Sequence, residues 1–189
     1  MASENKVDQK FLRFLTFIFN VPIIALLTAL IIFKRIRDAR AIMIFLTFFS
    51  IIQISEWFYF IKTGDYPKYR RFSFLVNMIS YTSGSLLLIL TKSNKIYIAI
   101  GLSYFLSGAF LAVINKLGYK ISGHAAGITG PGTAIGIIYG AIGFLFLLLL
   151  IPAGYAKIKI KDHIFMEFAS GTVATILITY LSFYIMGII

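Results

Sequence analysis

The chain has 189 residues, of which 59% are hydrophobic and only 13% are charged, against about 25% charged in an ordinary globular domain. This composition excludes a water-soluble domain and predicts an all-α, polytopic transmembrane helical bundle. Cysteine is absent, which excludes disulfides, thiolate metal sites and a cysteine nucleophile. The net charge is +11, but the basic residues form short clusters between apolar runs, so nucleic acid is not expected as a partner.

Apolar runs long enough to cross a membrane begin near the amino terminus. A crossing helix needs about 20 residues. The first run follows the mixed-charge stretch Met1 to Arg13 and lacks a small-residue cleavage site, so we expect it to be retained as a span. The first four runs predict spans at 11–33, 41–61, 72–91 and 96–114, and only Asn20 and Pro22 interrupt the first of them.

The stretch 121–155 is too long for one span and is rich in glycine. It predicts two short helices, roughly 121–139 and 141–157, with a turn near Gly140 and a last span at about 164–187. The chain is then a single integral membrane domain, 1–189, with seven spans. A single helix centred on 132–152 would instead give six spans. The residues that interrupt the stretch are Gly127, Gly130, Pro131, Gly132, Gly136, Gly140 and Gly143; the glycines are most simply explained by close helix packing.

The basic residues are distributed unequally between the two sides of the seven-span arrangement. The amino terminus and the loops 62–71, 116–120 and 157–161 share one side, and they carry twelve of the 18 Lys and Arg residues. The positive-inside rule places this side in the cytoplasm of a multi-pass cell-membrane protein. Basic residues needed for binding phosphate would distort the same count.

Both histidines lie beside predicted helix starts in polar surroundings. His124 follows Ser122 and Gly123, and the free amides and positive dipole of a helix start favour an anion. His163 precedes Glu167 by four residues, so the imidazole and the carboxylate share one helix face. An imidazole oriented by a carboxylate, with lysines nearby, indicates a nucleophile for a phosphoryl group. Each pattern alone is equally consistent with a structural cap or an interfacial polar pair.

Taken together, these residues resemble the type 2 phosphatidic acid phosphatase superfamily of membrane lipid phosphatases. The three motifs of that family are K-x6-R-P, P-S-G-H and S-R-x5-H-x3-D. The second motif is matched by Ser122, Gly123 and His124, with Ile121 in place of its proline. The third is matched in spacing, with Ala for Ser, Lys for Arg and Glu for Asp, by Ala156, Lys157, His163 and Glu167.

The first family motif has the weakest match. Lys62 and Arg70 lie at about the right place, but one extra residue separates them and no proline follows. The resemblance covers mainly 62–171, within a phosphatase-like core of about 62–187. All three segments lie on one side of the seven-span arrangement.

The resemblance implies hydrolysis of a polyprenyl diphosphate or a glycerophospholipid phosphate without a metal or cofactor. His163 would attack phosphorus and form a phosphohistidine, Glu167 would orient the imidazole, and His124 would protonate the leaving oxygen. Lysine in place of arginine at 157 keeps a point charge but loses two-point contact with phosphate. The implied phosphate-binding residues are Lys62 or Lys68, Arg70, Ser122, Gly123 and Lys157, with Lys116 and Lys120 as alternatives.

Two other kinds of function stay open at this point. One is a catalytically silent relative that binds a lipid headgroup or partner helices as a small membrane subunit. The other, a channel or transporter, is disfavoured because charges within the apolar segments are scarce. Glu56 is one such charge; its neighbour Trp57 indicates the membrane interface, and a polar cavity is the alternative.

Overall fold

The structure, a computed structural model, describes residues 4–189, without the side chains of residues 4–9, 66, 67 and 70. The described chain is helical and contains no β-strand, as the composition predicts. Its elements in chain order are α1 (Glu4–Ile18), α2 (Val21–Arg35), α3 (Ala39–Leu46), the π-helical turn η1 (Thr47–Ile51), α4 (Ile52–Thr63), α5 (Tyr66–Leu90), α6 (Lys95–Lys116), α7 (Gly123–Tyr139), α8 (Ala141–Phe144), the 3-10 turn η2 (Leu145–Leu149), α9 (Leu150–Lys159) and α10 (Phe165–Ile185).

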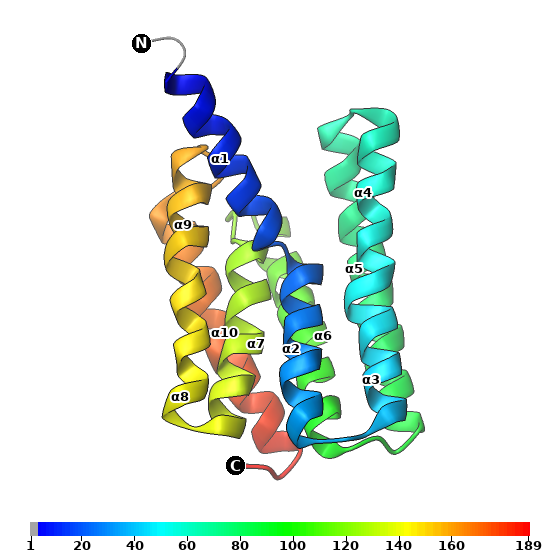
Figure 1. The fold of residues 1–189 in the computed structure, drawn as a ribbon. Helices are drawn as coiled ribbons and strands as arrows, with labels where there is room; N and C mark the ends of the chain where they lie inside the picture. The colour runs from blue at the N-terminus through cyan, green and yellow to red at the C-terminus, as the bar shows by residue number, and fades with distance from the viewer. Residues whose placement is uncertain (1–3) are drawn as a thin grey trace.

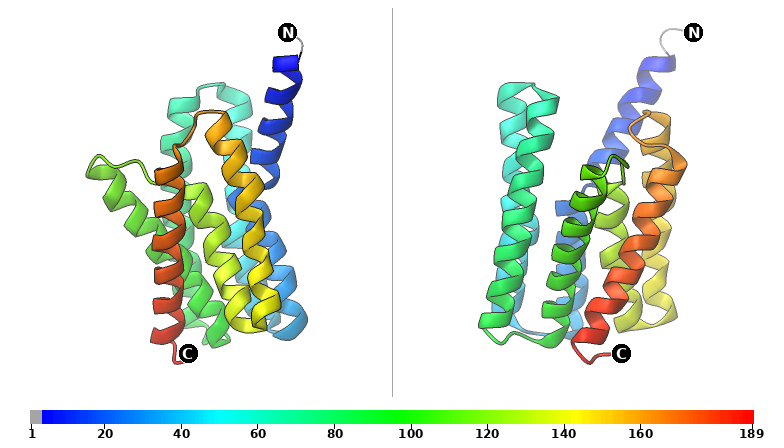
Figure 2. Two further views of the ribbon diagram at one scale, coloured as in Figure 1. Left: turned by 90° about the vertical axis from the view of Figure 1, so that its left-hand side faces the viewer. Right: turned by 180° about the vertical axis from the view of Figure 1, so that it is seen from behind.

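The helices stand side by side in one bundle with their connections at two opposite ends (Figure 1). The amino terminus and the α4–α5, α6–α7 and α9–α10 connections lie at one end, which we call the N-terminal end. The α2–α3, α5–α6 and α7–α8 connections and the carboxyl terminus lie at the other, the C-terminal end (Figure 2). The segments that carry the three motif matches therefore all lie toward the N-terminal end, as the spacing predicts.

Helix α7 lies in the middle of this bundle and is buried from residue 125 to 136. It packs against α2, α6, α10 and η2. A Cβ atom on Gly127 would lie 2.5 Å from the Val21 side chain, and one on Gly132 would lie 2.5 Å from Leu147. Glycine lets the neighbouring elements approach α7 closely at these two positions, as predicted for this stretch, whereas a Cβ on Gly140 would meet no atom within 4 Å.

The chain reverses direction at Gly140, between α7 and α8. Gly140 has φ +73° and ψ −151°, a region that is essentially restricted to glycine. The returning chain then approaches so closely that a Cβ on Gly143 would lie 2.3 Å from the Ile135 carbonyl oxygen. The predicted turn near Gly140 is confirmed, and the alternative of one helix centred on 132–152 is wrong.

The first predicted span, 11–33, is not one straight helix. The chain breaks between α1 and α2, and the two helices are bent by 43° relative to one another. Asn20 accepts the Val21 amide through its side chain at 2.9 Å, and Pro22 in the first turn of α2 has no amide with which to continue α1. A helix start inside the apolar run thus divides it.

Several helices of the described chain are long and apolar enough to cross a membrane. Five continuous helical segments qualify, and the bent pair α1–α2 makes six if it counts as one span. The five are Ala39–Thr63 (α3, η1 and α4), Arg71–Leu90, Lys95–Lys116, Ala141–Lys159 (α8, η2 and α9) and Phe165–Ile185. Such an arrangement is that of a multi-pass membrane protein. Seven spans are not confirmed, since α7 has 17 residues and a length of only about 25 Å.

The arrangement of the connections predicts which positions face the same side of the membrane. Because the chain lacks cysteine, single-cysteine variants can be labelled with a membrane-impermeant maleimide in sealed vesicles. We expect Thr63→Cys and Lys159→Cys to react from one side, since both lie toward the N-terminal end. Arg37→Cys and Lys95→Cys should react from the opposite side. Labelling of Thr63→Cys and Lys159→Cys from different sides would contradict the arrangement.

Candidate active site

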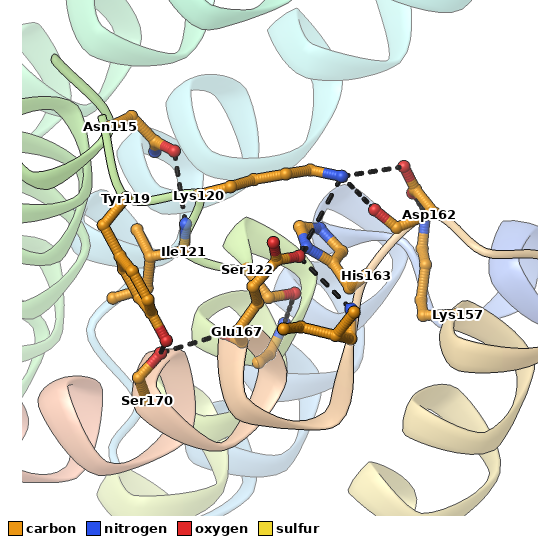
Figure 3. Close-up of polar contacts among 12 residues, drawn as sticks. Asn115, Tyr119, Lys120, Ile121, Ser122, Lys157, Asp162, His163, Glu167 and Ser170 are labelled. Carbon is orange, nitrogen blue, oxygen red and sulfur yellow. Dashed lines mark hydrogen bonds and ion pairs between the residues drawn. The ribbon is translucent and has the colours of Figure 1, made fainter.

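The centre of the site is an imidazole held by a carboxylate at the start of α10. His163 Nδ1 lies 2.8 Å from Glu167 Oε2, and the same oxygen accepts the Ile164 amide at 3.3 Å (Figure 3). Glu167 lies in the first turn of α10, where a carboxylate also complements the helix dipole. Because Nδ1 is engaged, Nε2 is the ring nitrogen that can carry chemistry.

His163 is buried, with only 9% of its surface exposed. Burial lowers the pKa of His163 below its ordinary value of 6.5. The Glu167 hydrogen bond and the nearby Asp162 charge oppose this effect, and the Lys120 charge adds to it. The imidazole is therefore neutral at neutral pH, which is the state that a nucleophile requires.

Two lysines meet at Asp162, the residue before His163. Lys157 Nζ lies 2.8 Å from Asp162 Oδ2, and Lys120 Nζ lies 4.0 Å from Oδ1 and donates a hydrogen bond to the Asp162 carbonyl (Figure 3). Lys120 Nζ is also 4.0 Å from Glu167 Oε2. Burial opposes ionisation of Asp162, but the Lys157 hydrogen bond and neighbouring positive charges outweigh it and lower its pKa. Asp162 is thus a carboxylate at neutral pH.

Sequence reasoning missed Asp162 and ranked Lys120 below Lys157. The loop after α9 explains the pairing, because it turns back on the helix end. The Asp162 amide donates to the Lys157 carbonyl at 3.1 Å, which returns the Asp162 side chain to the Lys157 ammonium. The signal in the sequence was an acid five residues after a lysine and directly before the histidine.

The segment around Ser122 is joined to the same place through the backbone. The Ser122 amide donates to the Glu167 carbonyl at 3.1 Å, and the Ser122 hydroxyl caps α7 by accepting the Ala125 amide at 3.3 Å. A Cβ on Gly171 would lie 2.7 Å from the Ser122 carbonyl oxygen, so glycine lets α10 approach this turn. The segments that match the second and third motifs therefore adjoin.

His124 and Gly123 follow Ser122 at the exposed edge of the site. Gly123 is exposed and His124 is half-buried. The His124 charge is among the positive charges that lower the pKa of Asp162. His124 thus acts electrostatically on the carboxylate beside His163.

The structure does not bring Lys62 and Lys68 to His163. Lys62 and Lys68 are exposed near the α4–α5 connection, and Lys68 pairs with Asp65 at 3.0 Å. This connection lies across the bundle from the α9–α10 connection (Figures 1 and 2). The Arg70 side chain lies outside the described part of the structure. Lys116 is exposed at the end of α6.

Comparisons with protein-family models, with curated proteins and with solved structures give no match to this chain. The functional assignment therefore depends on the chemistry of the residues themselves. Three groups of the described residues meet at the site. They are the His163–Glu167 pair, Asp162 with Lys157 and Lys120, and the turn at Ser122.

The groups that set the pKa of His163 predict the effect of replacing Glu167. Glu167→Gln removes the negative charge and replaces the carboxylate acceptor, both of which favour imidazolium, with a neutral amide, so the pKa of His163 should fall further below 6.5. Histidine NMR titration in a His124→Gln background measures this directly. Asp65→Asn, which alters a surface carboxylate at the distant α4–α5 connection, should leave the pKa of His163 unchanged. A higher pKa in Glu167→Gln would contradict the assigned pairing.

Proposed function

We propose that the protein is an integral membrane lipid phosphatase that acts through a phosphohistidine on His163. The observation that carries the proposal is a neutral, buried imidazole whose Nδ1 is held by Glu167, with two lysines meeting at the adjacent residue. The resemblance of the residue spacing to the type 2 phosphatidic acid phosphatases supports the same chemistry. The substrate class is a polyprenyl diphosphate or a glycerophospholipid phosphate.

The proposed reaction has two transfers of one phosphoryl group. His163 Nε2 attacks phosphorus, the bond from phosphorus to the leaving oxygen breaks, and His124 gives that oxygen a proton. His124 then takes a proton from water as the water oxygen attacks phosphorus and the P–N bond breaks. Phosphate leaves and His163 is restored. Lys120, Lys157 and the helix start at Ser122 to Gly123 neutralise charge on the phosphoryl oxygens.

The position of the site suits a substrate with an apolar tail. The charged groups lie toward the N-terminal end of a bundle whose outer surface is largely apolar, so a lipid headgroup can meet them while its chain stays beside the helices. We infer seven crossing segments in the cell membrane, with α7 as a short segment that its neighbours shield from lipid. The excess of basic residues favours the cytoplasm for the N-terminal end.

A catalytically silent relative that binds a lipid headgroup is the second candidate. The specific observation in its favour is that Lys120 and Lys157 both interact with Asp162. Their charge is then partly satisfied within the protein, and an incoming phosphate must compete with a carboxylate. Such a protein would bind a lipid phosphate without turning it over.

Removing the imidazole separates the two candidates. We expect His163→Ala to abolish the covalent phosphoenzyme and to lower phosphate release by at least about 1,000-fold, because no other group replaces the nucleophile. The measurement is phosphate release and acid-quenched labelling with a panel of lipid phosphates and diphosphates. Lys159→Ala, which changes an exposed lysine at the end of α9, should retain activity. Equal activity of His163→Ala and wild type would exclude the phosphatase mechanism, and an inactive wild type that still binds the lipids would favour the silent relative.

The Asp162 pairing predicts an unusual variant with tighter anion binding and lower stability. Asp162→Asn removes the carboxylate that competes for Lys157 and Lys120, so orthovanadate should bind about tenfold more tightly, roughly 1.4 kcal/mol. The same change leaves the buried Lys157 without that carboxylate and should lower the thermal unfolding temperature. Inhibition of activity and thermal unfolding in detergent measure the two effects. Asp65→Asn should change neither, whereas weaker vanadate binding by Asp162→Asn would show that Asp162 only positions the lysines.

A further inference from the structure

A second polar group lies between the antiparallel helices α4 and α5, away from His163. It comprises Gln53, Glu56, Ser73 and Asn77, which we call the hairpin seam. Gln53 and Glu56 are one turn apart on α4 and are 1% and 3% exposed. Ser73 and Asn77 are one turn apart on α5. The Ser73 hydroxyl donates to Glu56 Oε2, and Asn77 Nδ2 donates to Ser73 Oγ at 3.4 Å. Because α4 packs against the antiparallel α5, Gln53, one turn before Glu56, lies at the level of Asn77, one turn after Ser73.

Three oxygens of this seam are shielded and accept no hydrogen bond from the described residues. They are Gln53 Oε1, Glu56 Oε1 and Asn77 Oδ1. The amide nitrogen of Gln53 donates to the Phe48 carbonyl in η1 at 3.0 Å, and that of Asn77 donates to Ser73. In both side chains the amide nitrogen donates a hydrogen bond, and the amide oxygen is the atom without a partner. Buried acceptors without donors are costly, and because one of them belongs to the Glu56 carboxylate, the set favours a positively charged ligand.

The charge of the seam indicates which positive ligand fits. Glu56 has no ion pair among the described residues, and it lies within the apolar segment Ala39–Thr63, where a lone carboxylate is costly. A proton on Glu56 would supply a single hydrogen-bond donor, which cannot serve all three oxygens. A cation held between α4 and α5 would accept a lone pair from each of them. One carboxylate balances one positive charge, and oxygen ligands suit an alkali ion rather than a transition metal.

We propose that the hairpin seam binds one monovalent alkali cation through Gln53 Oε1, Glu56 Oε1 and Asn77 Oδ1. Sodium and potassium ions share this chemistry, and the experiment distinguishes them. The proposal is independent of the phosphatase function, because its residues belong to α4 and α5 and include none of those around His163. The π-helical turn η1 contributes by holding the Gln53 amide through the Phe48 carbonyl, which Ser80 also contacts. Such turns are frequent at functional sites.

Carbodiimide labelling of the purified full chain in detergent tests the site. The carboxyl O–H of Glu56 adds across one C=N bond of dicyclohexylcarbodiimide, and the acyl group then moves to nitrogen as a stable N-acylurea, with no further reactant. A bound cation replaces the reactive proton and slows this step. Peptide mass spectrometry then gives the labelling rate in sodium, potassium and choline chloride at equal ionic strength. We expect at least one alkali ion to slow labelling about fivefold or more relative to choline, and Glu56→Gln to remove the label.

Variants of the neutral ligands identify the coordinating oxygens. Gln53→Leu and Asn77→Leu should lose the protection by alkali ions while labelling in choline chloride continues. Thr82→Val, on the exposed face of α5, should keep it. Should the leucine variants fail to fold, the wild type still decides, because an alkali ion should raise its thermal unfolding temperature but not that of Glu56→Gln. Equal labelling rates and equal unfolding temperatures in all three salts would overturn the proposal.

Discussion

The close packing of α7 is the constraint on which the rest of the structure depends. A helix of small residues lies among α2, α6, α10 and η2, and a side chain at Gly127 or Gly132 would collide with its neighbours. The same closeness brings the start of α7 against α10, where the Ser122 amide reaches the Glu167 carbonyl. Since Glu167 in turn holds His163, the geometry of the imidazole depends on helix packing and not only on the loop that carries it.

Charge around the site is balanced so that each ionised group has a partner of opposite sign. Lys157 is buried, and its ammonium would be costly there without the Asp162 carboxylate at 2.8 Å. That pairing stabilises the resting protein but occupies a cation that a phosphate would use. Under the proposed function, an incoming phosphate would have to compete with Asp162 for these lysines, so part of its binding energy would be spent on separating that ion pair.

The features that sequence reasoning could predict are local ones. Helices, the turn at Gly140 and the His163–Glu167 pair follow from hydrophobic run length, from glycine and from a four-residue spacing. The break at Asn20 was visible as an interruption, but its effect depends on whether Asn20 caps a new helix. The position of Lys62 and Lys68 could not be predicted, because residues on one membrane side can still lie across the bundle from His163. The Asp162 pairing depends on how the chain turns after α9.

The two carboxylate centres of this apolar bundle differ in the groups that accompany them. Asp162 meets two lysines, so its charge is compensated by fixed positive charges of the protein. Glu56 instead accepts a hydrogen bond from a hydroxyl, and the amides nearby on α4 and α5, Gln53 and Asn77, have oxygens with no donor among the described residues. Amides carry no net charge, so they cannot neutralise a carboxylate, and a mobile positive charge must do so. If Glu56 had a purely structural role, a lysine at position 53 or 77 would neutralise it with a fixed ion pair. Neutral amides at both positions instead favour an exchangeable cation.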